Sequence, residues 1–133
     1  MRLAYLDSSA IVKLAHLEPE SQSLIDYLTA DEIEVSTSVV AEIEVIRALR
    51  RVRKDKPDIE QAMKGFYLLG LDEQIRQDAC TMGATTLRPL DAVHLATALA
   101  IGDDQLEFVT YDDRQADAAR GEGLTVVQPG RCV

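Results

Sequence analysis

The sequence has few of the side chains that build zinc sites and disulfide frameworks. Its 133 residues include two cysteines, Cys80 and Cys132, and two histidines, His16 and His94. No cysteine or histidine lies at a spacing typical of a metal site, and the two thiols are expected to stay reduced. These absences argue against a zinc module and against a fold held by disulfides.

Long apolar runs are also lacking, and so is the layout of a signal peptide, because Met1 and Arg2 lead directly into a strand-like run. We therefore expect a cytoplasmic protein with no membrane partner and a single domain over residues 1–133. The net charge is −9, from 23 acidic and 14 basic residues. This balance argues against a protein that coats nucleic acid by general attraction, but it permits an enzyme with a local basic patch and a metal ion.

Short apolar runs alternate with helical patterns along the whole chain. The predicted strands cover residues 3–6, 33–35, 66–71, 106–111 and 124–127. The predicted helices cover residues 10–15, 19–28, 39–53, 57–64, 73–82, 90–101 and 115–120. This alternation predicts an α/β fold with a parallel sheet covered on both faces, in which ligands bind outside the carboxyl ends of the strands.

Carboxylates stand at the places where such a sheet binds ligands. Asp7 directly follows the first predicted strand, and Asp112 follows the fourth. Asp91 stands in the first turn of a helix that is apolar in nearly every direction and should therefore be buried. A cation or hydrogen-bond donors must offset the cost of bringing an ionised Asp91 into such a region. For Asp7, an N-cap of the following helix is a serious alternative to a functional role.

The predicted helix 39–53 carries two further acids and much of the basic charge. Glu42 and Glu44 flank its apolar stripe on opposite sides, and periodicity does not choose between them. Arg47 follows Glu44 by three positions, so these two can pair on the surface. The stripe predicted to face the core is Val39, Val40, Ile43, Ile46 and Leu49. The basic cluster, which suits a solvated helix end and a partner-binding face equally well, is Arg47, Arg50, Arg51, Arg53, Lys54 and Lys56.

Converging carboxylates cannot all stay ionised side by side without a cation. Mg²⁺ and Mn²⁺ meet this need, since hard divalent ions prefer carboxylate oxygens and water. Such an ion can generate a hydroxide nucleophile and stabilise the leaving oxygen of a phosphodiester. The pattern of acids therefore indicates metal-assisted hydrolysis.

Four segments, in order along nearly the whole chain, resemble PIN domains, and the VapC toxins of type II toxin–antitoxin systems in particular. They are Tyr5–Ala10, Ser38 with Glu44 and Arg47, Leu87–Ala96, and Val109–Arg114. Each motif is short and degenerate, but the ordered set is specific. The resemblance implies a three-layer α/β/α PIN-like domain with a central parallel sheet flanked by helices.

The resemblance also implies an activity, a cofactor and partners. The activity is endoribonuclease cleavage of RNA, with Mg²⁺ or Mn²⁺ as cofactor. Asp7 and Asp91 would be the principal metal ligands, and Glu44 and Asp112 would be further ligands or would orient water. A cognate antitoxin would cover the acidic groove, and the toxin would form a homodimer.

Several assignments within this resemblance have neighbours that compete for them. The family spacing favours Glu44 over Glu42, and Asp112 matches the Thr-x-Asp position better than Asp113 does. Supporting donors in the same pocket would be Thr110 and either Ser8 or Ser9. His94 lies one helical turn beyond Asp91, where we expect a histidine that is buried in the core and makes its hydrogen bonds there.

Other acid-pocket proteins fit the sequence less well. Phosphorelay receiver domains and haloacid-dehalogenase-type phosphatases both need a lysine late in the chain, and none follows Lys64. The phosphatases also need a second aspartate two positions after Asp7, where Ser9 stands. The remaining alternative is a catalytically silent PIN-like binding module, which no feature of the sequence favours. Such a module should lack Mn²⁺ affinity that depends on Asp7 and Asp91.

Overall fold

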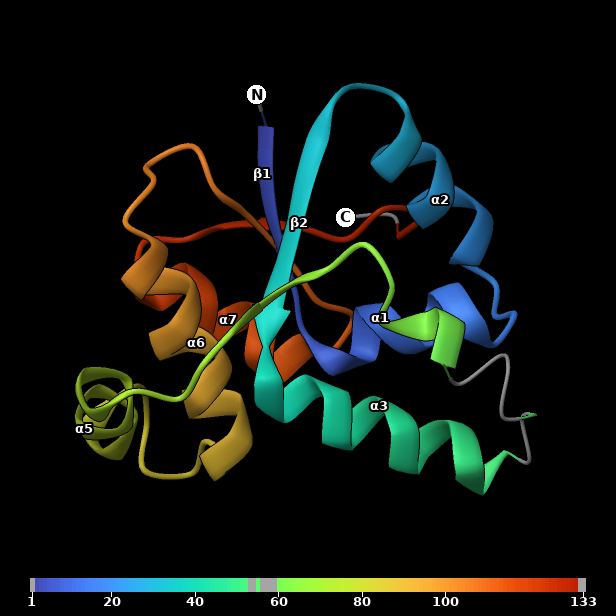
Figure 1. The fold of residues 1–133 in the computed structure, drawn as a ribbon. Helices are drawn as coiled ribbons and strands as arrows, with labels where there is room; N and C mark the ends of the chain where they lie inside the picture. Colours follow the sequence, from blue (N-terminus) through green and yellow to red (C-terminus); the bar gives the residue numbers. More distant parts are fainter. Residues whose placement is uncertain (1, 53–54, 56–59, 132–133) are drawn as a thin grey trace.

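A computed structural model describes residues 2–52, 55 and 60–131, and it contains a parallel sheet between two layers of helices (Figure 1). The strands are β1 (Arg2–Leu6), β2 (Ile33–Ser38), β3 (Tyr67–Leu69), β4 (Glu107–Val109) and β5 (Thr125–Val127). Their order is β3-β2-β1-β4-β5, and every neighbouring pair is parallel. The predicted α/β fold with a central parallel sheet is confirmed.

The helices begin where polar side chains can cap them. They are α1 (Ser8–Ala15), α2 (Ser21–Thr29), α3 (Val39–Arg51), α5 (Glu73–Thr81), α6 (Pro89–Ile101) and α7 (Asp113–Gly121). The side chains of Asp7, Ser38, Asp72 and Asp112 accept backbone N–H groups at the starts of α1, α3, α5 and α7. These helices match the predicted segments within a few residues. The helix predicted over 57–64 begins outside the described residues.

The strands bury both of their faces, because alternate side chains point to opposite sides of the sheet. On one side Ala4 and Leu6 of β1 pack in the core formed with α1, α2 and α3. On the other side Tyr5 stacks on Phe108 of β4 and packs with Leu95 of α6. Figure 1 shows the two helical layers, with α5, α6 and α7 on the side away from α1 and α2.

The two helices that carry predicted site residues differ in how well their burial was predicted. α6 is buried over most of its length, as its apolar sequence indicates. The prediction for α3 is partly wrong, because Ala41, Val45 and Leu49 are buried whereas Ile43 is 62% exposed. α3 has apolar residues on two faces, and the face with the small Ala41 packs toward α1. Ile43 is thereby left facing a cleft.

Two smaller expectations concern membranes and thiols. Within the described part of the chain, no helix combines the length and the apolar character that a membrane span requires. Cys80 is an exposed free thiol, and Cys132 lies outside the described residues.

The direction in which successive strands are added to the sheet reverses beside β1. From β1 the chain continues to β2 on one side, while β4 pairs with β1 on the other. In open parallel sheets such a switch point leaves a crevice at the carboxyl ends of the strands, where ligands bind. Asp7 follows β1 and Asp112 follows β4 by three residues, so both lie at this crevice.

Candidate active site

A cleft of about 900 Å³ opens at the carboxyl ends of β1 and β4. Its walls include α1, the part of α3 from Ile43 to Arg51, and the start of α6. The predicted acids that line it are Asp7, Glu44, Asp91 and Asp112. The alternatives Glu42 and Asp113 are exposed and lie outside this lining. Asp113 pairs instead with Arg131 at 2.8 Å. The fold therefore brings the four predicted acids to one cavity.

Asp7 combines a capping role with a place in the cleft. It is only 3% exposed. Its Oδ1 accepts hydrogen bonds from Ser9 Oγ at 2.6 Å and from the backbone N–H of Ala10 at 3.2 Å, while its Oδ2 accepts one from Thr110 Oγ1. Burial raises the pKa of Asp7 above its ordinary value, although nearby His94 and these donors oppose the rise. Asp7 is therefore the N-cap of α1, and the same side chain also lines the cleft.

Asp112 uses its two carboxylate oxygens for different purposes. Oδ1 caps α7 by accepting the backbone N–H groups of Arg114 at 2.9 Å and Gln115 at 3.1 Å. Oδ2 accepts a hydrogen bond from Arg88 Nη2 at 2.9 Å. Thr110 Oγ1 also accepts the backbone N–H of Asp112, so Thr110 joins Asp112 to Asp7. The cap fixes this carboxylate and leaves one oxygen open to the cleft.

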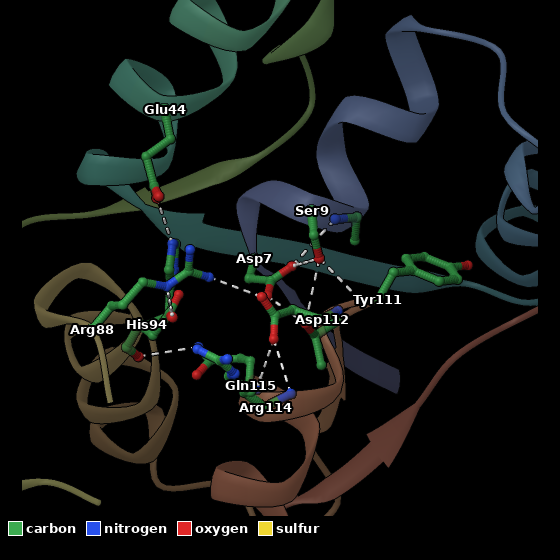
Figure 2. A network of polar contacts seen from close by, with 12 residues as sticks. Asp7, Ser9, Glu44, Arg88, His94, Tyr111, Asp112, Arg114 and Gln115 are labelled. Carbon is green, nitrogen blue, oxygen red and sulfur yellow. Dashed lines mark hydrogen bonds and ion pairs between the residues drawn. The ribbon is translucent and has the colours of Figure 1, made fainter. Parts of the chain in front are cut away.

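Arg88 is a site residue that the sequence analysis missed. Its Nη2 donates to Asp112 Oδ2 at 2.9 Å (Figure 2). Its Nε donates to Asp91 Oδ2 at 2.9 Å, so one guanidinium bridges two acids. Its position three residues before Asp91 was the available signal. Gln115, also missed, donates through Nε2 to the backbone oxygen of Asp91 at 3.0 Å. This contact between α7 and α6 has no signal in the sequence.

Glu44 is held by a buried histidine from the opposite layer. His94 Nε2 lies 2.8 Å from Glu44 Oε1, and His94 Nδ1 lies 2.6 Å from the Tyr5 hydroxyl. Because a carboxylate only accepts, Nε2 carries the proton that is donated to Glu44. Burial raises the pKa of Tyr5 and keeps its hydroxyl protonated. The surface pair expected between Glu44 and Arg47 is wrong, since Glu44 turns toward His94.

Basic side chains also line the cleft and differ in how they are paired. Lys13 pairs with Glu20 at 3.0 Å. Arg47 and Arg51, on successive turns of α3, make no ion pair within the part of the chain that the structure describes. The basic residues Arg53, Lys54 and Lys56 lie outside the described residues. The cleft thus combines acids with guanidinium groups that are free to meet an anion.

The donor chemistry of the cleft suits a hard divalent cation. Among the residues that are described, no three acidic, histidine or cysteine side chains form a ready ligand set. Yet the Oδ2 atoms of Asp91 and Asp112 already converge on one positive group, Arg88. These two oxygens attract a cation, and Mg²⁺ and Mn²⁺ suit them because both ions prefer carboxylate ligands.

Comparison with known proteins points to one family. The PIN domain model matches residues 4–121. Ribonuclease VapC46 of Mycobacterium tuberculosis (strain ATCC 25618 / H37Rv) is 43% identical over 130 residues, which cover 97% of this chain and 99% of the relative. Ribonuclease VapC35 of Mycobacterium tuberculosis (strain CDC 1551 / Oshkosh) is 38% identical over 133 residues, covering 97% and 98%.

Two solved structures share the fold at low sequence identity. The Mycobacterium tuberculosis toxin VapC20, described as cleaving the sarcin-ricin loop, has a TM-score of 0.75 at 14% identity and covers 95% of this chain and 99% of its own. A toxin–antitoxin complex from Klebsiella pneumoniae has a TM-score of 0.71 at 19% identity, with coverage of 95% and 97%. At such identities the likeness concerns the fold.

Proposed function

The chain belongs to the PIN domain family, and from this premise we propose that it is a metal-dependent endoribonuclease, the toxin of a VapBC-like type II toxin–antitoxin module. The observation that carries the proposal is the single cleft lined by Asp7, Glu44, Asp91 and Asp112. Relatives named as ribonucleases match over nearly their whole length, which supports RNA as the substrate. With cellular RNA as the proposed substrate, we also propose that this protein acts in the cytoplasm.

The four acids would hold Mg²⁺ or Mn²⁺. When bound, such an ion supplies a polarised water for attack on the phosphodiester and offsets the charge that develops on the leaving oxygen. Ser9 and Thr110 hold Asp7 in place, so its carboxylate needs no reorganisation. The start of α7 does the same for Asp112.

Glu44 would be a further ligand of the ion or would orient the attacking water. Its Oε1 is fixed by His94, which is itself fixed by Tyr5. A carboxylate oxygen retains acceptor capacity beyond one hydrogen bond, so a water in the cleft can donate to Glu44. This arrangement would set the direction of the water. Glu44 is not part of the bridge that Arg88 forms between Asp91 and Asp112.

The cleft also supports the proposed protein partners. Ile43 and Leu90, which are 62% and 44% exposed, stand on its walls beside the acids. An apolar and acidic groove suits an antitoxin segment that offers apolar side chains and a cation. The names of similar folds include toxin–antitoxin complexes, which supports a cognate antitoxin. A homodimer is proposed on the family resemblance alone.

The proposal is tested with purified, antitoxin-free protein and total cellular RNA. We expect cleavage with Mg²⁺ or Mn²⁺ and none with EDTA, because the acids need a cation to act together. The products are followed on denaturing gels, and Mn²⁺ binding is measured in parallel. Absence of both cleavage and Mn²⁺ binding would instead support the catalytically silent binding module. Mn²⁺ binding without cleavage would indicate a narrow RNA target that the sample lacks.

The unpaired arginines of α3 give a prediction about RNA affinity. Arg47→Gln and Arg51→Gln should each weaken binding of a single-stranded RNA about threefold, and each should reduce the salt slope of log K by about 0.7. Fluorescence anisotropy across a salt series measures both quantities. Arg120→Gln is the matched control, because Arg120 pairs with Asp117 and is absent from the cleft lining. Equal effects in all three variants would contradict a role for this wall of the cleft.

A further inference from the structure

We propose that Arg88 is an internal counter-ion: its guanidinium occupies the position in the cleft that a divalent ion would take. When a divalent ion binds, Arg88 is released and contacts the RNA phosphate. The inference rests on the proposed metal-dependent nuclease function and goes further. It assigns to this chain a device that couples metal binding to substrate binding.

Arg88 contacts the carboxylate oxygens that a metal ion in the cleft would use. Arg88 Nε and Nη2 lie 2.9 Å from Asp91 Oδ2 and 2.9 Å from Asp112 Oδ2, respectively. The other oxygen of Asp112 is committed to the cap of α7. Arg88 therefore occupies the oxygen of Asp112 that remains open to the cleft. A divalent ion and Arg88 compete for this position, because two cations held close together at the same pair of oxygens repel each other.

Arg88 can leave these oxygens while the backbone stays in place. Its side chain is 63% exposed, and within the described residues its two carboxylate contacts are its only hydrogen bonds. Arg88 is the N-cap residue of α6, yet its side chain makes no capping bond, and Pro89 fixes the first turn. Exposed ion pairs are weak, whereas a divalent ion brings twice the charge to the same oxygens.

The released Arg88 side chain can bind a phosphate in the same cleft. Arg88 lines the same cleft as Arg47 and Arg51. While it bridges Asp91 and Asp112, its charge is neutralised by the two carboxylates, and the N–H groups of Nε and Nη2 that face them are occupied. Once freed, a guanidinium offers paired N–H groups that match a phosphate. Metal binding thus creates a phosphate contact, and by linkage RNA binding favours the metal-bound state.

The competition is tested by calorimetric titration of Mn²⁺ into the metal-free protein. Arg88→Gln should bind Mn²⁺ about tenfold more tightly than wild type, since two exposed ion pairs no longer have to be broken. Arg47→Gln is the matched control, because it removes the same charge from the same cleft without breaking an ion pair, and its gain should be clearly smaller. Equal or weaker Mn²⁺ binding by Arg88→Gln, relative to Arg47→Gln, would overturn the proposal. If wild type itself binds no Mn²⁺, the proposed metal site fails as well.

The release toward phosphate is tested with a fluorescent, single-stranded 2′-O-methyl phosphorothioate oligonucleotide as the probe. Its Kd is measured in EDTA and in saturating Mn²⁺, and the ratio of the two gives the coupling. Arg88→Gln should reduce this ratio about threefold, as expected for loss of one cationic contact made only in Mn²⁺. Arg47→Gln should weaken binding in both conditions and keep the ratio. An unchanged ratio in Arg88→Gln would overturn the release.

Discussion

Replacing Asp91 by asparagine is expected to lower RNA cleavage by at least about 100-fold while the protein stays folded. Asparagine keeps the shape of the side chain but loses the charge that a divalent cation requires. The local fold does not depend on that charge, because α6 begins at Pro89 and Gln115 bonds the backbone oxygen of residue 91. Cleavage rates at saturating Mn²⁺ measure the effect, and circular dichroism checks the fold.

A surface aspartate supplies the control for this substitution. Asp26 is exposed on α2, where it accepts a hydrogen bond from Gln22, and it is absent from the cleft lining. Asp26→Asn should cleave RNA as the wild type does. Wild-type cleavage by Asp91→Asn, with metal binding intact, would show that the mechanism with four acids is wrong.

The sequence allowed the sheet and the position of the acids to be predicted because both depend on local rules. Apolar runs that alternate with helices indicate parallel strands, and residues just after such strands meet at one edge. Asp7 and Asp112 follow this rule, and both also cap the next helix. The cap and the site share one cause, since a helix start at the carboxyl end of a strand faces the crevice.

Features that depend on contacts between layers could not be predicted in the same way. The link from Glu44 to His94 joins α3 to α6 across the sheet, and it replaced the expected pair with Arg47. The helical spacing of the apolar residues predicts Ile43 in the core, but α3 packs through Ala41, Val45 and Leu49 instead. Arg88 stands beside Asp91 in sequence, yet its second partner comes from the end of another strand.

Asp7→Asn is expected to abolish RNA cleavage, again by about 100-fold or more, and to stabilise the metal-free protein at neutral pH. Both effects come from the charge of a buried carboxylate. Asparagine can still cap α1 and can still accept the hydrogen bond from Ser9. It has no charge to be desolvated, however, and it offers a metal ion a weaker ligand. Cleavage assays and thermal unfolding in EDTA measure the two effects on one variant.

The pH dependence of this stabilisation follows from the pKa of Asp7, which burial raises in the folded protein. Below the ordinary aspartate pKa of about 3.9, the carboxyl is neutral in both the folded and the unfolded chain, so Asp7→Asn gains nothing. As the pH rises through the higher folded pKa, the wild type must ionise a buried group and loses stability that the variant keeps. At neutral pH a gain of about 1 kcal/mol would raise Tm by roughly 3–5 °C.

Saturating Mn²⁺ should reverse this order, because an ion that binds the ionised Asp7 stabilises only the wild type. Unfolding curves of both proteins are measured at pH 4 to 8, with EDTA and with Mn²⁺. They show whether the buried charge of Asp7 destabilises the metal-free fold or is already offset by its hydrogen-bond donors. If Asp7→Asn is the less stable protein at every pH in EDTA, Ser9, Thr110 and the start of α1 already offset the burial. A crossing of the two orders on addition of Mn²⁺ would mean that the fold carries an unfavourable charge at this position for the sake of the metal.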